Sequence, residues 1–338
     1  MLRFFNRFIY GLNIVFVFIL LATFLFPYLA PSKVVIIPVL SLGVPIIILI
    51  NIVFCVYWLI QMRSKFLLSL IAVGLSVWYF NIFPTFSNPK PKSDFENSLK
   101  VMSYNVRLFN AYEKEDFGNV TDIMNNYIAT ENPDIICIQE YFVPNKIDFS
   151  DYPYKFIYFK KEKDQLGYAI FSKYPLQNTG AFDFSDSNNN TIYTDIIKEN
   201  DTLRLYNMHL QSHGVISEVE FLQETSTERL LKQLNGRFRQ QETQVKKILS
   251  HKAASNYPVL FVGDFNNTPY SYSYNKLMRN MKDAFREAGS GLGTTFSFQG
   301  FPMRIDFILT SPIFETTSFK VLDNTFSDHR AIVADLSW

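Results

Sequence analysis

Three long stretches near the start of the chain carry no charged side chain, whereas the remainder alternates short apolar runs with polar segments. The uncharged stretches cover residues 8–29, 34–60 and 66–83. A helix needs about 17–25 mainly apolar residues to cross a bilayer core about 30 Å thick, and each stretch is long enough. We therefore predict three transmembrane α-helices over these ranges. Pro38 and Pro45 predict a kink early in the second of them.

The basic residues between these stretches predict how the helices are oriented. Arg3 and Arg7 precede the first stretch. Arg63 and Lys65 lie between the second and the third, whereas Lys33 alone follows the first. Loops rich in Lys and Arg stay in the cytoplasm, so the N-terminus is expected inside and the part after the third helix outside. We expect an integral protein of the cytoplasmic (inner) membrane, with its soluble domain on the extracytoplasmic side.

The charge distribution separates this anchor from a soluble domain. The chain has 338 residues and a net charge of +1, but all 31 acidic residues lie at or after Asp94. Because 25 of the 32 basic residues also lie there, residues 94–338 carry a net charge of −6. We predict a membrane anchor at residues 1–86, a polar, proline-containing linker at 87–98 and one domain at 99–338. The two cysteines lie in apolar runs, so neither a disulfide framework nor a cysteine-rich metal site is expected.

Short runs rich in Val, Ile, Phe and Tyr predict the strands of this domain. They cover residues 100–106, 135–139, 155–159, 168–171, 191–197, 203–209, 259–263, 294–298, 304–309, 319–321 and 331–336. Apolar residues at helical spacing predict helices at 120–130 and 228–251, with a shorter one at 272–279. About eleven strands with a few helices between them indicate an α/β fold of two packed sheets flanked by helices.

Polar residues end or interrupt several of the predicted strands. They are Asn105, Glu140, His209, Asp264, Asn266 and Asp306. Burying a carboxylate costs several kcal/mol unless it is paired or bound to a metal, so packing alone rarely explains such positions. The ends of strands are also where α/β folds usually place their sites. A single residue of this kind more often forms a turn, so the prediction of a site depends on their number.

Short motifs around these residues occur in a fixed order. They are SYNV at 103–106, IQE at 138–140, HL at 209–210, GDFN at 263–266, RIDFIL at 304–309 and SDH at 327–329. Together they resemble the motif series of the endonuclease/exonuclease/phosphatase (deoxyribonuclease-I-like) superfamily, here in a membrane-anchored, bacterial-type member. That superfamily includes abasic-site endonucleases, sphingomyelinases and inositol polyphosphate 5-phosphatases. The resemblance covers about residues 99–338 and implies a four-layer sandwich of two packed mixed β-sheets flanked by helices.

The resemblance also implies a metal site. Glu140, with Asn105 nearby and Asp328 contributing, would hold a hard divalent cation, which is Mg²⁺ or alternatively Mn²⁺. Oxygen ligands without a cysteine cluster are what such an ion prefers.

The remaining motif residues are expected to act on the substrate. Asp264 and Asn266 would position the attacking water and hydrogen-bond the phosphate oxygens. Asp306 would orient His329 through its ring N–H. His209 would contact the phosphate and protonate the leaving oxygen. The sequence leaves open whether Asp264 or His329 takes the proton of the water.

These observations predict a membrane-anchored, divalent-metal-dependent phosphodiesterase acting on nucleic acid or on a phospholipid head group. A net charge of −6 argues against binding long duplexes, whereas attachment to the lipid bilayer raises the local concentration of lipid substrates. No protruding apolar hairpin is evident, which argues against a lipid. A phosphomonoesterase and a non-catalytic binding or scaffold protein with the same fold are the alternatives. The sequence identifies no protein partner.

Overall fold

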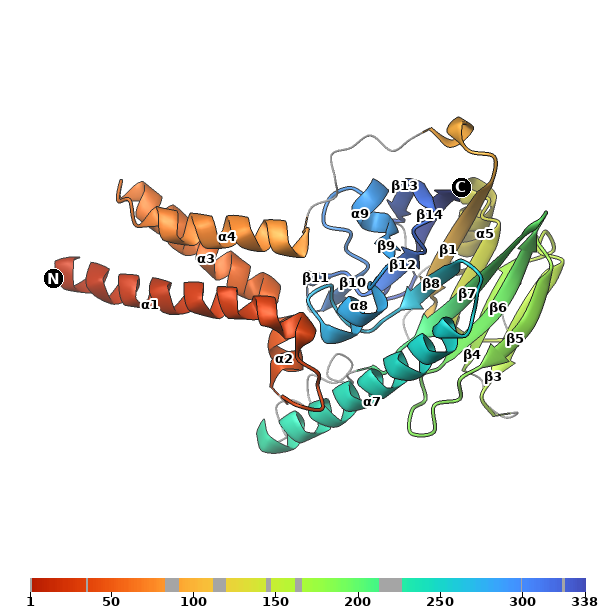
Figure 1. The fold of residues 1–338 in the computed structure, drawn as a ribbon, viewed down its shortest axis with the longest axis horizontal. Helices are drawn as coiled ribbons and strands as arrows, with labels where there is room; N and C mark the ends of the chain where they lie inside the picture. The colour runs from red at the N-terminus through yellow and green to blue at the C-terminus, as the bar shows by residue number, and fades with distance from the viewer. Residues whose placement is uncertain are drawn as a thin grey trace.

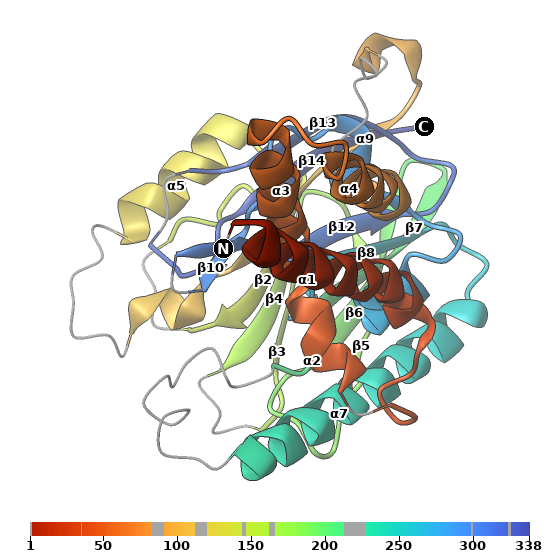
Figure 2. The ribbon, with the colours of Figure 1, turned by 90° about the vertical axis from the view of Figure 1, so that its left-hand side faces the viewer.

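A computed structural model describes residues 2–34, 36–82, 91–111, 120–143, 147–161, 166–212, 227–298, 300–323 and 326–338. An elongated N-terminal helical unit projects from a layered α/β domain (Figure 1). Seen along the helical unit, the strands and helices of the domain spread out behind it (Figure 2). The helical unit comprises α1 (Leu2–Ala22), the 3₁₀ helix η1 (Thr23–Tyr28), α2 (Ile37–Leu42), α3 (Val44–Ile60) and α4 (Phe66–Phe80).

Two six-stranded sheets form the centre of the domain. The first has the order β13 (Glu315–Val321), β14 (Ile332–Ser337), β1 (Ser98–Asn105), β2 (Ile135–Tyr141), β4 (Gly167–Ser172), β3 (Tyr154–Phe159). The second has the order β5 (Leu176–Ala181), β6 (Thr191–Lys198), β7 (Asp201–His209), β8 (Val259–Asp264), β12 (Asp306–Thr310), β9 (Lys282–Asp283). Both sheets are mixed, because β1 pairs with β2 and β7 with β8 in parallel while the other pairs are antiparallel.

A short hairpin and several helices complete the domain. The hairpin joins β10 (Phe296–Phe298) to β11 (Phe301–Met303). The helices are the 3₁₀ helices η2 (Lys92–Asp94) and η3 (Arg107–Asn110), and α5 (Val120–Glu131), α7 (Thr227–Ala253), α8 (Tyr272–Leu277) and α9 (Ala284–Ala288).

Alternating side chains of the strands build three apolar layers. In β1, Val101 belongs to the core between the two sheets, whereas the next residue, Met102, packs under α5 with Met124. On the other side of the domain, Val245 of α7 and Phe261 of β8 belong to the core under the second sheet. The result is a helix, sheet, sheet, helix sandwich. The prediction of two packed mixed sheets flanked by helices is therefore confirmed.

The structure adds elements that the sequence pattern did not predict. All eleven predicted strands are present in the described residues, with ends that differ by a few positions, but β5, β9 and β11 were missed. β5 is an edge strand whose sequence LQNTGA is largely polar, so it lacks the alternation of a half-buried strand. β9 and β11 have only two and three residues.

The prediction of three long transmembrane helices needs correction. Among the described residues, one helical segment, Phe4–Tyr28 with 25 residues, is long and apolar enough to cross a membrane. The second predicted stretch instead contains two helices, α2 and α3, which meet at Gly43. Pro45 is favourable only near the start of a helix, so α3 begins at Val44 and has 17 residues. α4 has 15 residues and ends before Asn81, whose backbone is left-handed.

Parts of these predictions fall outside the described residues. They are residue 35 of the second stretch, residue 83 of the third and residues 87–90 of the linker.

The helical unit buries several polar side chains and exposes many of its large apolar side chains. The side chains of Asn13 and Ser69 are fully buried and hydrogen-bonded to each other, and the indole N–H of Trp58 donates to Asn13. In contrast, Phe18 and Ile71 are 69% and 60% exposed. This arrangement is the reverse of a water-soluble bundle, in which the large apolar side chains face inward.

The helical unit contacts the domain through specific bonds. Asn275 of α8 donates from its amide to the carbonyl of Pro27 in η1 (3.0 Å). The backbone N–H of Ser32 donates to Glu242 of α7 (2.8 Å), a carboxylate that is almost fully buried. The ring of Phe80 at the end of α4 packs edge-on against Tyr270, 4.9 Å between centroids. The helices therefore rest on α7, α8 and the loop that leads from β8 to α8.

Gly263, the last residue before Asp264, is predicted to be indispensable for the fold. Its φ is +130°, and a Cβ atom there would lie 2.1 Å from the carbonyl oxygen of Met208 in β7. We expect Gly263→Ala to destabilise the protein by about 3 kcal/mol or more, lowering the midpoint of thermal unfolding by about 5–10 °C. Gly236→Ala, in open space on α7, is the control and should leave the midpoint unchanged or raise it. Equal midpoints for the two variants would contradict the prediction.

Candidate active site

The eight residues predicted to form a site come from one end of the two sheets. Asn105, His209 and Asp264 end β1, β7 and β8, Asp306 begins β12, and Glu140 lies one residue before the end of β2. Asn266, Asp328 and His329 lie in the loops after β8 and before β14. Parallel pairing places the carboxyl ends of β1 and β2, and of β7 and β8, at the same edges, and the antiparallel partners return there.

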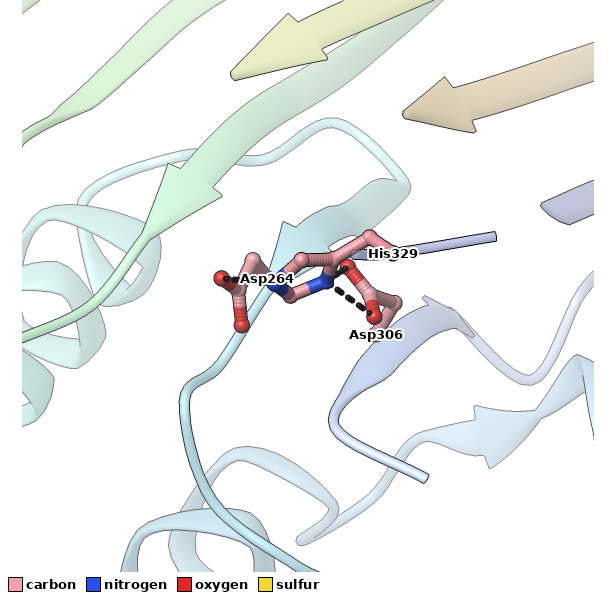
Figure 3. Close-up of side chains that lie close together, drawn as sticks. All are labelled: Asp264, Asp306 and His329. Carbon is pink, nitrogen blue, oxygen red and sulfur yellow. Dashed lines mark hydrogen bonds and ion pairs between the residues drawn. The ribbon is translucent and has the colours of Figure 1, made fainter. Parts of the chain in front are cut away.

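Two buried carboxylates stand opposite each other in the second sheet. Asp306 is the direct cross-strand partner of Asp264, and the two residues are 2% and 1% exposed. Like charges in such positions repel each other. The ring of His329 lies between them (Figure 3): Nδ1 is 2.9 Å from Oδ2 of Asp306, and Nε2 is 3.7 Å from Oδ2 of Asp264. The imidazole therefore separates and compensates the two charges.

The surroundings of His329 favour its charged form. Burial alone would lower the pKa of His329, but the carboxylates of Asp306 and Asp264 outweigh it and raise the pKa to about 10. Both oxygens of Asp306 lie within hydrogen-bond distance of Nδ1, so the ring N–H at this atom is donated to Asp306. Nε2, on the opposite edge of the imidazolium ring, then points to Asp264. His329 is placed as a cation and hydrogen-bond donor.

Glu140 owes its position to a break in the regular strand. The pairing of β2 with β4 shifts register between Gln139 and Tyr141, and Glu140 has a φ of +55°. A bulge of this kind turns a side chain away from its regular direction. Here it brings Oε1 of Glu140 to 3.3 Å from the amide nitrogen of Asn105 and 3.7 Å from Nε2 of His209.

Asn105 connects the carboxylates of the two sheets. Its amide nitrogen donates to Glu140 and, at 3.2 Å, to Asp264, while its oxygen accepts the backbone N–H of Arg107. The bond from Arg107 fixes which end of the amide faces the carboxylates. Asn105, predicted as a metal ligand, thus presents its NH₂ group to Glu140 and Asp264.

His209 is held as a neutral ring. Burial and the nearby positive charge of His329 lower the pKa of His209 to about 3. Its Nε2 lies 3.6 Å from Asp264, and its buried Nδ1 has no hydrogen-bond partner among the described residues. A neutral imidazole can donate a hydrogen bond at one nitrogen but is a poor proton donor near neutral pH. This geometry favours phosphate contact over the predicted protonation of the leaving oxygen.

The loop after β8 is fixed by side-chain bonds. The backbone N–H of Asn266 donates to Asp264 (2.7 Å), and its amide donates to the carbonyl of Leu210 (3.0 Å). Gln241 of α7, fully buried, accepts from the amide of Asn267 (2.8 Å) and donates to the carbonyl of Phe265 (2.9 Å).

Sequence reasoning missed Gln241. The signal was present, because a glutamine lies there on the apolar face of a predicted helix.

Asp328 lies at the outer side of the site. It is exposed, its Oδ1 lies 3.2 Å from the hydroxyl oxygen of Ser327, and its charge adds to burial in raising the pKa of Glu140. The same hydroxyl donates to the carbonyl of Asn105 (2.8 Å). All eight predicted residues are therefore linked, seven of them through side chains and Asp328 through Ser327.

The donor set fits a hard divalent cation. Glu140, Asp264 and Asp328 offer carboxylate oxygens, which such ions prefer. Burial raises the pKa of Glu140 and raises that of Asp264 to about 8, and a bound cation would offset the cost of burying these charges. Ligand atoms of Asp264, Asp306 and His329 also lie within 4.8 Å of one another. In that group Nδ1 of His329 is already bonded to Asp306, so the group is the less suitable metal site. We therefore favour Glu140 as the metal ligand.

Comparison with known proteins identifies two regions. Residues 102–329 match the endonuclease/exonuclease/phosphatase family, and residues 6–83 match a domain of unknown function, DUF8431. A curated relative, the DNA-(apurinic or apyrimidinic site) endonuclease of Dictyostelium discoideum, is 24% identical over 213 residues, which are 63% of this chain and 52% of the relative. The chain thus spans about half the length of that relative.

Solved structures share the fold of the domain. TDP2 of D. rerio complexed with a single-strand DNA product has a TM-score of 0.54 at 15% identity, covering 72% of this chain and 100% of its own. Truncated TDP2 of Caenorhabditis elegans has a TM-score of 0.51 at 20% identity, with 71% and 98% covered. An endonuclease/exonuclease/phosphatase family protein of Bacteroides thetaiotaomicron has a TM-score of 0.53 at 19% identity, with 72% and 98% covered.

Members of the matched family are hydrolases of phosphoester bonds. The match extends over two thirds of the sequence and includes all eight predicted site residues. The chain belongs to the endonuclease/exonuclease/phosphatase family.

Proposed function

We propose that this protein is a divalent-metal-dependent phosphodiesterase, attached to a membrane, that hydrolyses nucleic acid. The observation that carries the proposal is the buried cluster of Asp264, His329 and Asp306 beside the carboxylate of Glu140. Burying several ionisable groups together is costly, and stability alone gains little from such a cluster. Hydrolysis of a phosphodiester needs a base, a cationic donor and a metal ligand, which these side chains supply.

Asp264 acts as the base in this proposal. His329 cannot accept a proton while Nδ1 donates to Asp306 and the ring is positively charged. Asp264 accepts bonds from Asn105 and from the backbone N–H of Asn266, which hold the carboxylate in place. The carboxylate of Asp264 takes the proton of the attacking water. His329 donates from Nε2 to a non-bridging phosphate oxygen, where negative charge grows in the transition state.

Glu140, together with Asp328, would hold the divalent cation, Mg²⁺ or Mn²⁺. When bound, such an ion neutralises charge on the phosphate oxygens and on the leaving oxygen. Asn105 keeps Glu140 and Asp264 at a fixed separation through its two N–H bonds. Neutral His209 orients the phosphate, and Asn266, whose amide donates to Leu210 and Asp264, holds Asp264 toward the attacking water.

Nucleic acid is the favoured substrate class. It is supported by the names of the matched relatives, an abasic-site endonuclease and TDP2 with a single-strand DNA product. A phospholipid head group is the second candidate. The observation in its favour is that the helical unit contacts residues just after the loop of Asn266, through Pro27 and Asn275.

The helical unit is the proposed membrane anchor. Large apolar side chains such as Phe18 and Ile71 are exposed, and polar side chains such as Asn13 and Ser69 are buried, as in helices surrounded by lipid. α1 with η1 has the length of a span, and the shorter α3 and α4 pack beside it. A hydrogen bond from Asn6 to Gln61 places the turn with Arg63 and Lys65 beside the start of α1. This basic end would stay in the cytoplasm, which puts the domain on the extracytoplasmic side.

Asp264→Ala and His329→Ala should each lower kcat for phosphodiester hydrolysis by about 10³-fold or more, because each removes a group that acts in the transition state. The measurement is Mg²⁺-dependent cleavage by the detergent-solubilised full chain, tested with single-stranded and duplex DNA, RNA, bis(4-nitrophenyl) phosphate and phospholipids. His251→Ala, a histidine at the far end of α7, is the matched control and should retain activity. Cleavage of lipids alone would establish the second candidate. Inactivity on every diester would refute the proposed function.

Metal removal should abolish the activity, and adding Mg²⁺ or Mn²⁺ should restore it. We expect Glu140→Gln to raise the Mg²⁺ concentration for half-maximal activity by about tenfold or more, because it removes a charged ligand. The control is Glu315→Gln, which breaks only a surface ion pair with Lys282. Full activity in excess EDTA, or an unchanged Mg²⁺ requirement for Glu140→Gln, would be incompatible with this site.

The full chain should remain in the membrane pellet after alkaline carbonate extraction. A reporter that is active only outside the cytoplasm, fused after Trp338, should be active. Phe18→Lys places a charge on the exposed apolar face of α1 and should weaken retention, since such a charge costs about 2.5–3.5 kcal/mol at the bilayer centre. Lys173→Gln on the domain is the control. Release of the unaltered chain by carbonate would contradict the proposed anchor.

A further inference from the structure

A cavity of about 490 Å³ adjoins the proposed active site. Its walls come from the β10–β11 hairpin, with Phe296 and Pro302, and from the segment before β14, with Asp328 and Arg330. Phe296 also forms an isolated antiparallel bridge with His329, and their ring centroids are 5.0 Å apart. The cavity therefore starts at one proposed metal ligand and shares a wall with the proposed cationic donor.

Arg330 supplies the positive charge among the described residues that line this cavity. Its backbone N–H donates to the carbonyl of Thr295 (2.8 Å), which fixes the residue on the cavity wall. The guanidinium lies 3.4 Å from the carboxylate of Asp323, and the two side chains are 42% and 95% exposed. A pair this exposed contributes about 0–1 kcal/mol, so a better anion can displace the carboxylate at little cost.

We propose that Arg330 binds a second phosphate of the substrate, adjacent to the one that is hydrolysed, and that Asp323 holds the guanidinium in place until then. Guanidinium groups bind phosphates through two parallel N–H···O bonds, which makes Arg suited to this task. The inference rests on the proposed function and narrows it: the substrate is a strand with consecutive phosphates, as in single-stranded nucleic acid. Because residues 94–338 carry a net charge of −6, they must hold such a strand by local positive charge.

Arg330→Gln tests this inference through the difference between two substrates. Cleavage of a single-stranded oligonucleotide is compared with cleavage of bis(4-nitrophenyl) phosphate, which has one phosphate, using the full chain. We expect kcat/KM for the oligonucleotide to fall about tenfold, mainly because KM rises. This loss should be about fivefold larger than the loss of kcat/KM for the small ester. Arg330→Lys should recover part of the loss, and Asp323→Asn should lower KM for the oligonucleotide. Equal losses on both substrates would overturn the inference.

Binding of a labelled oligonucleotide in EDTA, followed by fluorescence anisotropy, tests the same contact without hydrolysis. Removing one phosphate contact should reduce the slope of log K against log salt concentration by about 0.7 for a single strand. Arg239→Gln, an exposed charge on α7, is the matched control and should leave the slope unchanged. An unchanged slope for Arg330→Gln would refute the second phosphate site even in an active enzyme. A reduced slope in a chain that cleaves nothing would refute the proposed function alone.

Discussion

The pairing of Asp264 with Asp306 across β8 and β12 is the constraint on which the site depends. Two carboxylates opposite each other in a buried sheet repel, and neither has water around it to reduce the cost. A protonated His329 that lies between them relieves this repulsion. The segment before β14 must therefore return to the end of the second sheet, although β14 itself belongs to the first. The ion triad of Asp264, His329 and Asp306 thus links the end of the first sheet to the end of the second.

The same requirement explains the irregular backbone around the site. Glu140 and Asn266 have φ values of +55° and +49°, a left-handed conformation that asparagine tolerates but that costs a glutamate about 1 kcal/mol or more. Regular strand geometry at Glu140 would point its side chain elsewhere, and a regular loop at Asn266 would not return its N–H to Asp264. Surrounding hydrogen bonds stabilise both conformations, so the cost is met by the rest of the fold.

Strand ends were predictable from the sequence, whereas the local geometry was not. An Asp or Asn that directly follows an apolar run, as Asp264 and Asn105 do, is visible in the residue pattern itself. The bulge at Glu140 arises from the pairing of β2 with β4, and the sequence of β2 alone does not reveal how that pairing is made. Pro38 and Pro45 predicted a kink in the apolar run of 27 residues, but not that the run divides at Gly43 into two separate helices. The positive charge of His329 likewise depends on its partners Asp306 and Asp264. The SDH motif by itself does not indicate it.

The helical unit and the proposed site share one loop. Gln241 of α7 binds the backbone at Phe265 and the side chain of Asn267 from one side, next to Asn266. From the other side, the helical unit contacts the same segment, where Phe80 packs on Tyr270. A loop held between two rigid elements keeps Asn266 in its left-handed conformation with less freedom than a loop at a free surface. The helical unit therefore stabilises the geometry around Asp264, in addition to its proposed attachment of the domain to a membrane. Replacing the helices by a flexible tether would then lower activity as well as change location.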